Sequence, residues 1–147
     1  MSGPTKRDLF LRACLEQLGN VVVWGVLDCS ELIAIGEKAA GLPDRRATHR
    51  AQTYAAENPE AAEPPKPGDL GFFGRDWAHV IHVVTLTADG HVLSADGATS
   101  ATKDYETAEK NPSARVRLHP DVTWYRSAQF LGWRVHRELD VLTPPYP

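Results

Sequence analysis

Cys29 is the residue with the clearest potential for chemistry in this sequence, because a turn leads there into a predicted helix. Residues 27–33 read Leu-Asp-Cys-Ser-Glu-Leu-Ile, and the apolar residues that follow recur at helical spacing. The first turn of a helix has unpaired backbone N–H groups and partial positive charge, and both favour the thiolate form of a cysteine. The thiolate is the nucleophilic form, so Cys29 is a candidate nucleophile.

A cysteine nucleophile needs a base within hydrogen-bonding distance, and two histidines compete for this role. His79 and His82 flank the start of a strand that the pattern predicts over residues 80–87. Side chains alternate between the two faces of a strand, so at most one of these histidines can face the thiol. His79 lies at the strand's start, where strict alternation need not hold. Periodicity alone therefore leaves both histidines open as the base.

The predicted elements that position these residues change type halfway along the chain. Helical periodicity predicts helices over residues 5–18, 29–40 and 48–57, and a short helical turn over 104–110. Alternating or β-branched patterns predict strands over residues 69–73, 80–87, 91–95, 114–118, 122–126 and 130–136. Helices followed by an antiparallel sheet indicate an α+β fold. The length of 147 residues indicates one domain over residues 1–147.

The composition disfavours several classes of partner and cofactor. The net charge is −3 and no basic stripe is visible, which disfavours nucleic acid and anionic membranes as partners. No apolar run approaches the ~20 residues of a membrane span, and the N-terminus lacks a secretory signal. We therefore expect synthesis in the cytoplasm and delivery by other machinery. The two cysteines and the histidine spacing suggest neither a disulfide framework nor a zinc site, so no cofactor is expected.

An ordered series of short motifs resembles the NlpC-type family of bacterial cell-wall cysteine peptidases, which are papain-like enzymes. The motifs are Trp24-Gly25, Asp28-Cys29-Ser30, Pro67-Gly68-Asp69-Leu70 followed by Phe72-Phe73, and Ile81-His82-Val83. They correspond to the family's W-G, D-C-S-G-L, P-G-D-L-x-F-F and H-V-G-I segments, in the family's order and over residues 18–96. The resemblance implies a papain-like fold with N-terminal helices packed on an antiparallel sheet. It also implies Cys29 as nucleophile, with Trp24 and Asp28 beside the substrate; Asp28 is in addition predicted to cap the helix.

The resemblance also separates the two candidate bases. In the family, a third polar residue follows the base by about twelve positions, inside the returning strand of a hairpin. Twelve positions after His82 is Ser94, within Val-Leu-Ser-Ala, whereas twelve positions after His79 is His91, next to the turn glycine. The resemblance thus implies His82 as base and Ser94 as third residue. Asp96, on the same strand face as Ser94, is an alternative third residue, and His79 with His91 is the rival pair.

The chain departs from the family pattern at three positions around the predicted nucleophile. Val22 stands at the family's tyrosine, Val26 at its second glycine, and Glu31 at the glycine after D-C-S. Since Cys29 and a histidine are kept, the chemistry is expected to be retained. The substrate pocket is expected to differ from that of the housekeeping wall enzymes.

The function implied by the resemblance is that of a cysteine peptidase acting on the cell wall. It would cleave amide bonds in peptidoglycan stem peptides through a Cys–His acyl-enzyme mechanism without a metal. Residues 96–100, 114–116 and 124–126 resemble phage-borne members more loosely, which implies phage tail, lysis or secretion components as partners. Two alternatives stay open. One is an N-acetylmuramoyl-L-alanine amidase or acyltransferase on the same fold, and the other is a non-catalytic wall-binding or structural domain.

The remaining histidines, cysteine and tryptophans are assigned to structural roles. Cys14 is expected to be a small buried side chain within the first helix, and Trp124 and Trp133 are expected in the core. His49, His119 and His136 are expected at the surface.

Overall fold

The computed structural model describes residues 3–24, 27–61, 64–97 and 104–141, so that Val26 and residues 98–100 lie outside its description. The helices are α1 (Lys6–Leu15), α2 (Cys29–Ala39), α3 (Ala51–Glu57) and α4 (Tyr105–Glu109). The strands are β1 (Leu70–Asp76), β2 (His79–Leu86), β3 (Val92–Ala95), β4 (Val116–His119) and β5 (Gln129–Arg134). The 3₁₀ helices η2 (Val122–Trp124) and η3 (Arg137–Asp140) flank β5.

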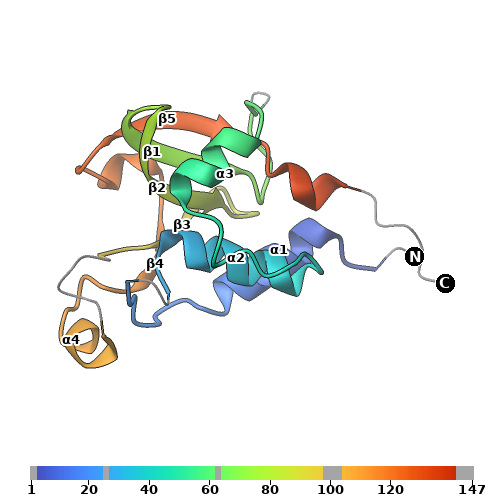
Figure 1. Cartoon of the computed structure of the whole chain (residues 1–147). Coiled ribbons are helices and arrows are strands. Elements are labelled where there is room, and N and C mark those ends of the chain that lie inside the picture. The colour runs from blue at the N-terminus through green and yellow to red at the C-terminus, as the bar shows by residue number, and fades with distance from the viewer. Residues whose placement is uncertain (1–2, 25–26, 62–63, 98–103, 142–147) are drawn as a thin grey trace.

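The described strands form one five-stranded antiparallel sheet in the order β4-β3-β2-β1-β5. Helices α1 and α2 pack against each other, and α2 also contacts β2 and β3 (Figure 1). Helix α3 packs on β2. This arrangement confirms the predicted α+β fold, in which N-terminal helices pack on an antiparallel sheet. Among the described residues, no helix combines the length and the apolar character needed to cross a bilayer.

The start and end of α1 follow from local sequence signals. The Thr5 side chain accepts a hydrogen bond from the backbone N–H of Asp8, and the Asp8 carboxylate accepts one from the backbone N–H of Thr5. This is a capping box, which satisfies two N–H groups that the helix leaves unpaired. The helix ends at Leu15, three residues earlier than expected, and the chain then turns through Gly19 at a φ of +82°. Glycine adopts this left-handed conformation without steric cost.

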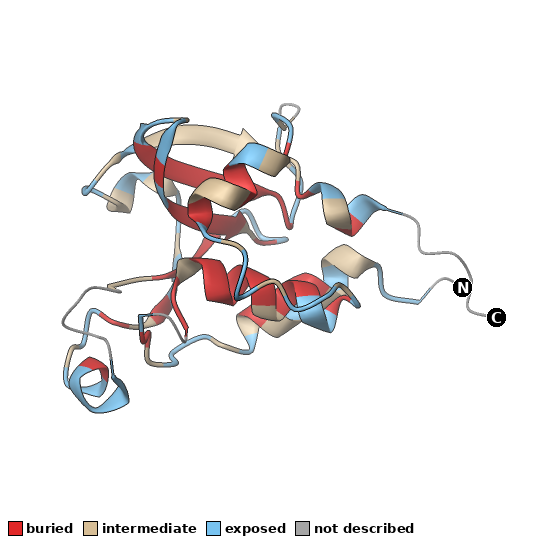
Figure 2. Cartoon of the chain, in the orientation of Figure 1, coloured by how far each residue is buried: buried red, intermediate tan, exposed pale blue. Residues whose placement is uncertain are grey.

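Apolar side chains cover both faces of the sheet. The larger cluster lies between the sheet and the helices and contains Cys14, which is 0% exposed as expected. Figure 2 shows the buried residues concentrated in α2 and in the central strands. A smaller cluster surrounds Phe73 and Val84, and Trp124 and Trp133 pack against it while staying partly exposed. The two tryptophans therefore border the core instead of lying inside it.

Strand β2 contains a bulge immediately before His82. Phe73 of β1 pairs with His82, and Gly74 pairs with Val80, so Ile81 has no partner in β1. A bulge inserts one residue and shifts the alternation of the residues that follow. As a result Ile81 is 55% exposed, and His82 lies against Phe73 and not on the face of Val80.

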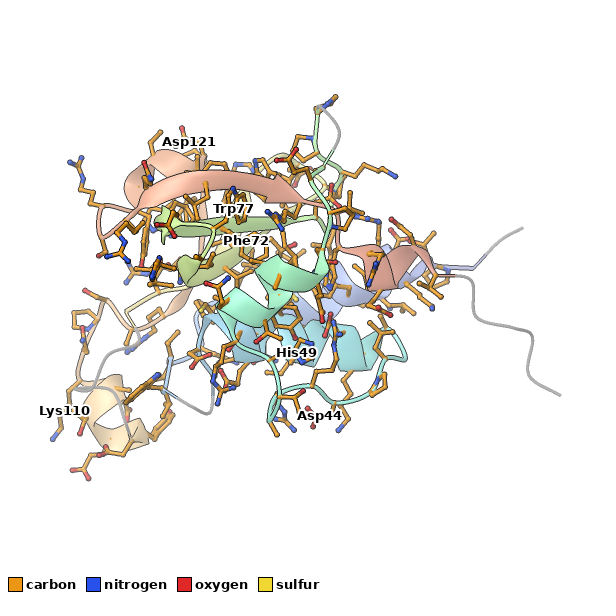
Figure 3. The ribbon with its side chains drawn as sticks, turned by 45° about the horizontal axis from the view of Figure 1, so that its top comes forward. Asp44, His49, Phe72, Trp77, Lys110 and Asp121 are labelled. Atoms are coloured by element: carbon orange, nitrogen blue, oxygen red, sulfur yellow. The ribbon has the colours of Figure 1, made fainter. Side chains whose placement is uncertain are left out.

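The strand predicted over residues 122–126 is wrong, because the chain forms the 3₁₀ helix η2 there. Asp121, labelled in Figure 3, accepts hydrogen bonds from the backbone N–H and the hydroxyl of Thr123. A capping aspartate offers the backbone N–H an alternative to a strand partner. The β-branched Val122 and Thr123 gave a strand pattern that this local bond overrides.

A buried charged cluster joins the helices to the chain after β5, and it makes the surface assignment of His136 wrong. His136 and Glu37 are both 0% exposed, with Nε2 of His136 at 2.6 Å from Oε2 of Glu37. Arg45 donates two hydrogen bonds to the Glu37 carboxylate, and the Tyr54 hydroxyl donates a third. Nδ1 of His136 lies 3.0 Å from the carbonyl oxygen of Gly68. These bonds fix the segment that precedes β1 and the segment that follows β5 against α2.

His49 is also not a free surface residue. Its side chain is 13% exposed, and its Nε2 lies 2.9 Å from Oε2 of Glu57. The hydroxyl of Thr48 lies 2.8 Å from the other ring nitrogen. Helix α3 begins at Ala51, three residues later than expected, and these side-chain bonds hold the turn that precedes it.

Candidate active site

Cys29 is the first residue of α2, and the residue before it caps this helix. The Asp28 carboxylate accepts hydrogen bonds from the backbone N–H groups of Ser30 and Glu31. An aspartate in this position satisfies N–H groups that have no partner within the helix. The predicted capping role of Asp28 is therefore confirmed, and Cys29 lies at the helix N-terminus as expected.

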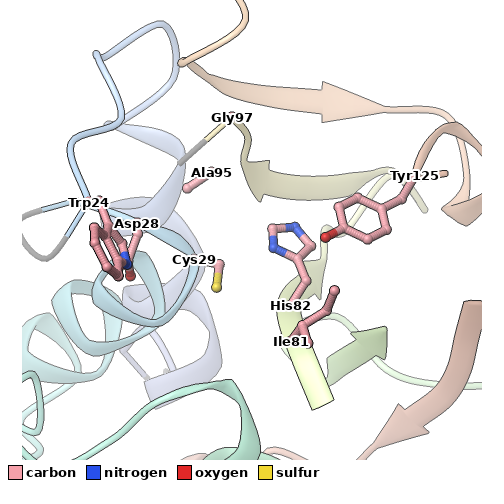
Figure 4. A pocket seen from close by; sticks show the side chains of 8 residues that line it. All are labelled: Trp24, Asp28, Cys29, Ile81, His82, Ala95, Gly97 and Tyr125. Atoms are coloured by element: carbon pink, nitrogen blue, oxygen red, sulfur yellow. The ribbon is translucent and has the colours of Figure 1, made fainter. Parts of the chain in front are cut away.

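A pocket of about 150 Å³ opens beside Cys29 and is built from four segments of the chain. Its lining residues are Trp24, Asp28, Cys29, Ile81, His82, Ala95, Gly97 and Tyr125 (Figure 4). Trp24 is 51% exposed and Asp28 is buried, so the two candidate substrate-binding residues lie at different depths of this pocket. The structure thus brings Trp24, Asp28, Cys29 and His82 together.

His82 faces Cys29 across the pocket, with a ring nitrogen on the side of the sulfur (Figure 4). Its Nε2 lies 2.8 Å from the hydroxyl oxygen of Ser94. Because Nε2 is engaged by Ser94, Nδ1 is the nitrogen that remains for the thiol. The order Cys29, His82, Ser94 is the order in which a nucleophile, a base and an orienting group must be arranged.

Two aromatic rings that also contact each other, those of Tyr125 and Phe73, pack against the imidazole of His82. The Tyr125 ring stacks on it with centroids 4.7 Å apart and planes 2° from parallel. The Phe73 ring contacts the same imidazole at a tilt, with centroids 5.8 Å apart and planes at 52°. His82 is 7% exposed, so its orientation is set by packing as well as by the bond to Ser94.

His79 and His91, the rival pair, lie elsewhere. The side chain of His79 is 54% exposed, and its Nδ1 lies 2.7 Å from Oδ1 of Asp76. His79 borders a separate groove, which it shares with Arg75 and Ser127. His91 is exposed next to the hairpin turn. The geometry therefore favours His82 as the base, in agreement with the family pattern.

Burial favours the neutral forms of the Cys29 thiol and the His82 imidazole. Burial, followed by the negative charge of Asp28, raises the pKa of Cys29 to about 12, although the backbone N–H groups of Val83 and Ser30 act in the opposite direction. Burial, followed by the electrostatic influence of His119, lowers the pKa of His82 to about 4. These shifts act against the influence of the helix N-terminus, which favours the thiolate. Transfer of the proton from sulfur to imidazole would create two opposite charges that stabilise each other.

Ser94 is part of a longer hydrogen-bonded chain that the sequence reasoning did not identify. Its hydroxyl donates to Oδ1 of Asp96 over 2.6 Å, and Oδ2 of Asp96 lies 2.6 Å from Nε2 of His119. The imidazole of His119 stacks on Trp124 with centroids 3.9 Å apart. The surface assignment of His119 is therefore wrong. The alternating pattern of residues 114–118 places His119 on the face of Arg115 and Arg117, so the sequence contained no signal for this contact.

Two of the three departures from the family pattern fall on described residues. Val22 is 0% exposed and does not line the pocket, so no polar side chain replaces the family's tyrosine there. Glu31 is 3% exposed, and its Oε1 lies 3.9 Å from Nη1 of Arg50. Within the described part of the chain, no group of three or more His, Cys, Asp or Glu side chains has metal-binding geometry.

The fold is similar to that of solved NlpC/p60 domains. One is RipD from Mycobacterium tuberculosis, which is described as a non-catalytic NlpC/p60 domain protein with an adaptation to peptidoglycan-binding function. RipD and this chain share 17% sequence identity and a TM-score of 0.64, and the match covers 91% of this chain and 98% of RipD. The peptidoglycan hydrolase RipB from the same organism shares 19% identity and a TM-score of 0.60 with this chain, and the match covers 92% of this chain and 72% of the RipB chain. An NlpC/p60 family protein from Bacillus cereus shares 20% identity and a TM-score of 0.65 with this chain, and the match covers 90% of this chain and 40% of the Bacillus protein.

No protein-family model matches the sequence, and no curated protein matches it. The structural similarity nevertheless extends over about nine tenths of this chain in each comparison above. The chain therefore has the NlpC/p60 fold, and the resemblance inferred from its motifs is confirmed at the level of the fold.

Proposed function

We propose that this chain, which has the NlpC/p60 fold, is a cysteine hydrolase that cleaves amide bonds in the stem peptides of peptidoglycan. The observation that carries the proposal is the arrangement of Cys29 at the start of α2, facing an imidazole whose far nitrogen is held by Ser94. A buried cysteine with a purely structural role needs no oriented base beside it.

The proposed reaction begins with the neutral pair that the burial of both groups favours. As the sulfur of Cys29 attacks the amide carbonyl carbon, Nδ1 of His82 takes the thiol proton and the carbonyl electrons move to oxygen. Backbone N–H groups at the start of α2, with that of Cys29 foremost, would stabilise this oxyanion. His82 then donates the proton to the leaving nitrogen as the C–N bond breaks, which leaves a thioester on Cys29.

The second half of the reaction regenerates the enzyme. His82 removes a proton from water while the oxygen attacks the thioester carbonyl, and the sulfur leaves with the proton that His82 holds. The products are a carboxylic acid and an amine, so the net reaction is hydrolysis. No metal or organic cofactor takes part in this proposal.

Peptidoglycan is the proposed substrate because two proteins of similar fold act on it or bind it. RipB is named as a peptidoglycan hydrolase, and RipD is named for peptidoglycan binding. The absence of a polar side chain at Val22 supports a pocket that recognises the peptide differently from family members with a tyrosine there. Delivery to the wall by phage or secretion machinery stays a prediction, which detection of the protein in purified phage particles or culture fluid would test.

The test is the digestion of purified sacculi with mass spectrometry of the released muropeptides. Wild type is expected to release peptide fragments, and Cys29→Ala is expected to release none. Cys14→Ala is the matched control, because Cys14 is 0% exposed and lies outside the pocket. Equal release by wild type and Cys29→Ala would exclude this mechanism.

The identity of the released ends decides between reactions on the same site. Cleavage between amino acids supports the peptidase, whereas a free lactyl end on the sugar identifies an N-acetylmuramoyl-L-alanine amidase. Transfer of an acyl group to an added amine, without release by water, identifies an acyltransferase. In all three cases Cys29 forms a thioester, but its acyl group differs with the bond that is cleaved.

A non-catalytic peptidoglycan-binding domain is the second candidate function. It is favoured by the raised pKa of the Cys29 thiol and by the likeness to RipD, which is described as non-catalytic. In that case wild type and Cys29→Ala would sediment equally with sacculi, and neither would release fragments.

A further inference from the structure

We propose that Asp96 determines the tautomer of His82 through the hydroxyl of Ser94, and that His119 positions Asp96 for this task. The inference rests on the proposed function, since it concerns how the proposed base is prepared. Asp96 and His119 do not line the wall of the pocket that holds Cys29. They are therefore positioning residues that act through Ser94.

The direction of each hydrogen bond follows from the chemistry of its partners. The Asp96 carboxylate has only acceptors, so the single hydroxyl hydrogen of Ser94 is donated to it over 2.6 Å. The Ser94 oxygen can then only accept at its contact with Nε2 of His82, which is 2.8 Å away. Nε2 therefore carries the imidazole hydrogen. Nδ1, on the side of Cys29, is left with the lone pair that a base requires.

Without Asp96, the direction of the hydrogen bond between Ser94 and His82 would not be fixed. The Ser94 hydroxyl could rotate and donate to Nε2 of His82, because a hydroxyl is both donor and acceptor. The imidazole hydrogen would then sit on Nδ1 and point toward the sulfur of Cys29, where it cannot accept the thiol proton. A serine alone thus holds the ring in place but does not choose its tautomer.

His119 fixes the carboxylate that makes this choice. Its Nε2 lies 2.6 Å from Oδ2 of Asp96, so the two oxygens of Asp96 each have one donor. The imidazole of His119 is itself held by stacking on Trp124, with planes 7° from parallel. The side chains of Asp96 and His119 are each 15% exposed, which limits competition from water. The connected chain runs from Trp124 through His119, Asp96 and Ser94 to His82.

The test is the tautomer of His82 in Asp96→Asn, measured by ¹⁵N NMR on the full chain above pH 7. The side-chain amide of asparagine can donate to Ser94, which releases the hydroxyl hydrogen for Nε2 of His82. Wild type is expected to show His82 protonated at Nε2, and Asp96→Asn is expected to show a large population protonated at Nδ1. The His82→Asn spectrum assigns the signals.

Kinetics on a soluble stem peptide supply the second readout. In Asp96→Asn, kcat is expected to fall about 100-fold while KM changes less than about threefold. The reason is that the substitution affects the base and leaves the contacts with the substrate intact. His119→Phe keeps a ring on Trp124 but removes the donor, and a fall in kcat of about tenfold is expected. Asp89→Asn is the matched control, since Asp89 is exposed in the hairpin turn.

The proposal is overturned if Asp96→Asn keeps His82 protonated at Nε2, or if its kcat stays within about twofold of wild type. Should Asp96→Asn fail to fold, Ser94→Ala carries the same expectation of mixed His82 tautomers, and a single Nε2-protonated form there would also overturn it. The NMR result does not depend on turnover. An inactive wild type with the expected tautomer shift would therefore refute the proposed function and leave the relay supported.

Discussion

The imidazole of His82 stacks face to face on the ring of Tyr125, with centroids 4.7 Å apart and planes 2° from parallel. Tyr125 follows η2, whereas Cys29 begins α2, and both line the same pocket. The proposed base is thus held between a residue that reaches it from the C-terminal part of the chain and a thiol from the N-terminal helices.

Replacing Tyr125 with alanine is expected to lower kcat about tenfold, because the imidazole loses one of its two aromatic supports. Burial lowers the pKa of His82 to about 4, so the hydration that follows loss of the ring is expected to raise this pKa toward its usual value. An NMR titration of His82 measures the shift. Tyr125→Phe keeps the stacking and is expected to stay within about twofold of wild type. Tyr105→Ala, at an exposed residue of α4, is the control. If Tyr125→Ala has the kcat and the His82 pKa of wild type, the role assigned to Tyr125 is contradicted.

Alkylation of the resting protein by iodoacetamide is expected to be slow at neutral pH. The raised pKa of Cys29, about 12, leaves very little thiolate, so the rate is expected to be at least ~100-fold below that of free cysteine at pH 7.5 and to rise with pH. The rate is measured from pH 5 to 10 in Cys14→Ala, which has one thiol. A rate that is already constant between pH 6 and 8 would instead indicate a preformed thiolate–imidazolium pair.

Asp28→Asn is expected to accelerate this alkylation. Burial and the charge of Asp28 together raise the pKa of Cys29, and the substitution removes the charge while asparagine can still cap α2. We expect the alkylation rate at pH 8 to be about tenfold higher, because a pKa of Cys29 that is about one unit lower gives about ten times as much thiolate. Asp28→Ala removes the cap as well, and is expected to cost about 1 kcal/mol in the free energy of unfolding. Denaturant unfolding separates the two effects, and equal alkylation rates in Asp28→Asn and wild type would contradict the charge argument.

The buried carboxylate of Glu37 is expected to make the protein sensitive to acid. Burial opposes its charged form, but hydrogen bonds from His136 and Arg45 prevail and lower the pKa of Glu37 from 4.5 to about 2. A lowered pKa in the folded state stabilises the fold above the unfolded pKa, and this contribution is lost as the pH falls from about 4.5 to about 2. Its size at neutral pH is on the order of 3 kcal/mol.

Glu37→Gln is therefore expected to lower the free energy of unfolding at pH 7 and to flatten its dependence on pH between 4.5 and 2. Urea unfolding at a series of pH values measures both effects. Glu16→Gln, at the exposed end of α1, is the matched control. If the two variants have the same unfolding free energies as wild type across this range, the buried cluster does not contribute as described.

Features that depend on residues close in sequence were predictable. The capping box of Thr5 with Asp8, the cap of α2 by Asp28 and the position of Cys29 behind it each involve bonds that span three residues or fewer. The hairpin of β2 and β3, whose strands are joined by a short turn, was also predictable, and it brings Ser94 to the strand of the base. Where a local bond competed with a pattern, as Asp121 does in η2, the pattern alone gave the wrong element.

Features that depend on pairing between distant segments were not predictable from the pattern. The bulge at Ile81 is a property of the β1–β2 pair, and it decides which face His82 occupies. His119 meets Asp96 across 23 positions, and His136 meets Glu37 across 99, so neither partner is visible in the neighbouring sequence.

The sequence by itself thus determined the element types, the helix that carries Cys29 and the pair of histidines from which the base is drawn, because hydrophobic period and capping act over a few residues. Only the tertiary structure placed the imidazole of His82 on the wall of the pocket beside Cys29, with Asp96 and His119 behind Ser94. Strand register and burial are set by contacts between segments far apart in the chain, and the same burial raises the pKa of the Cys29 thiol, against the influence of the helix N-terminus.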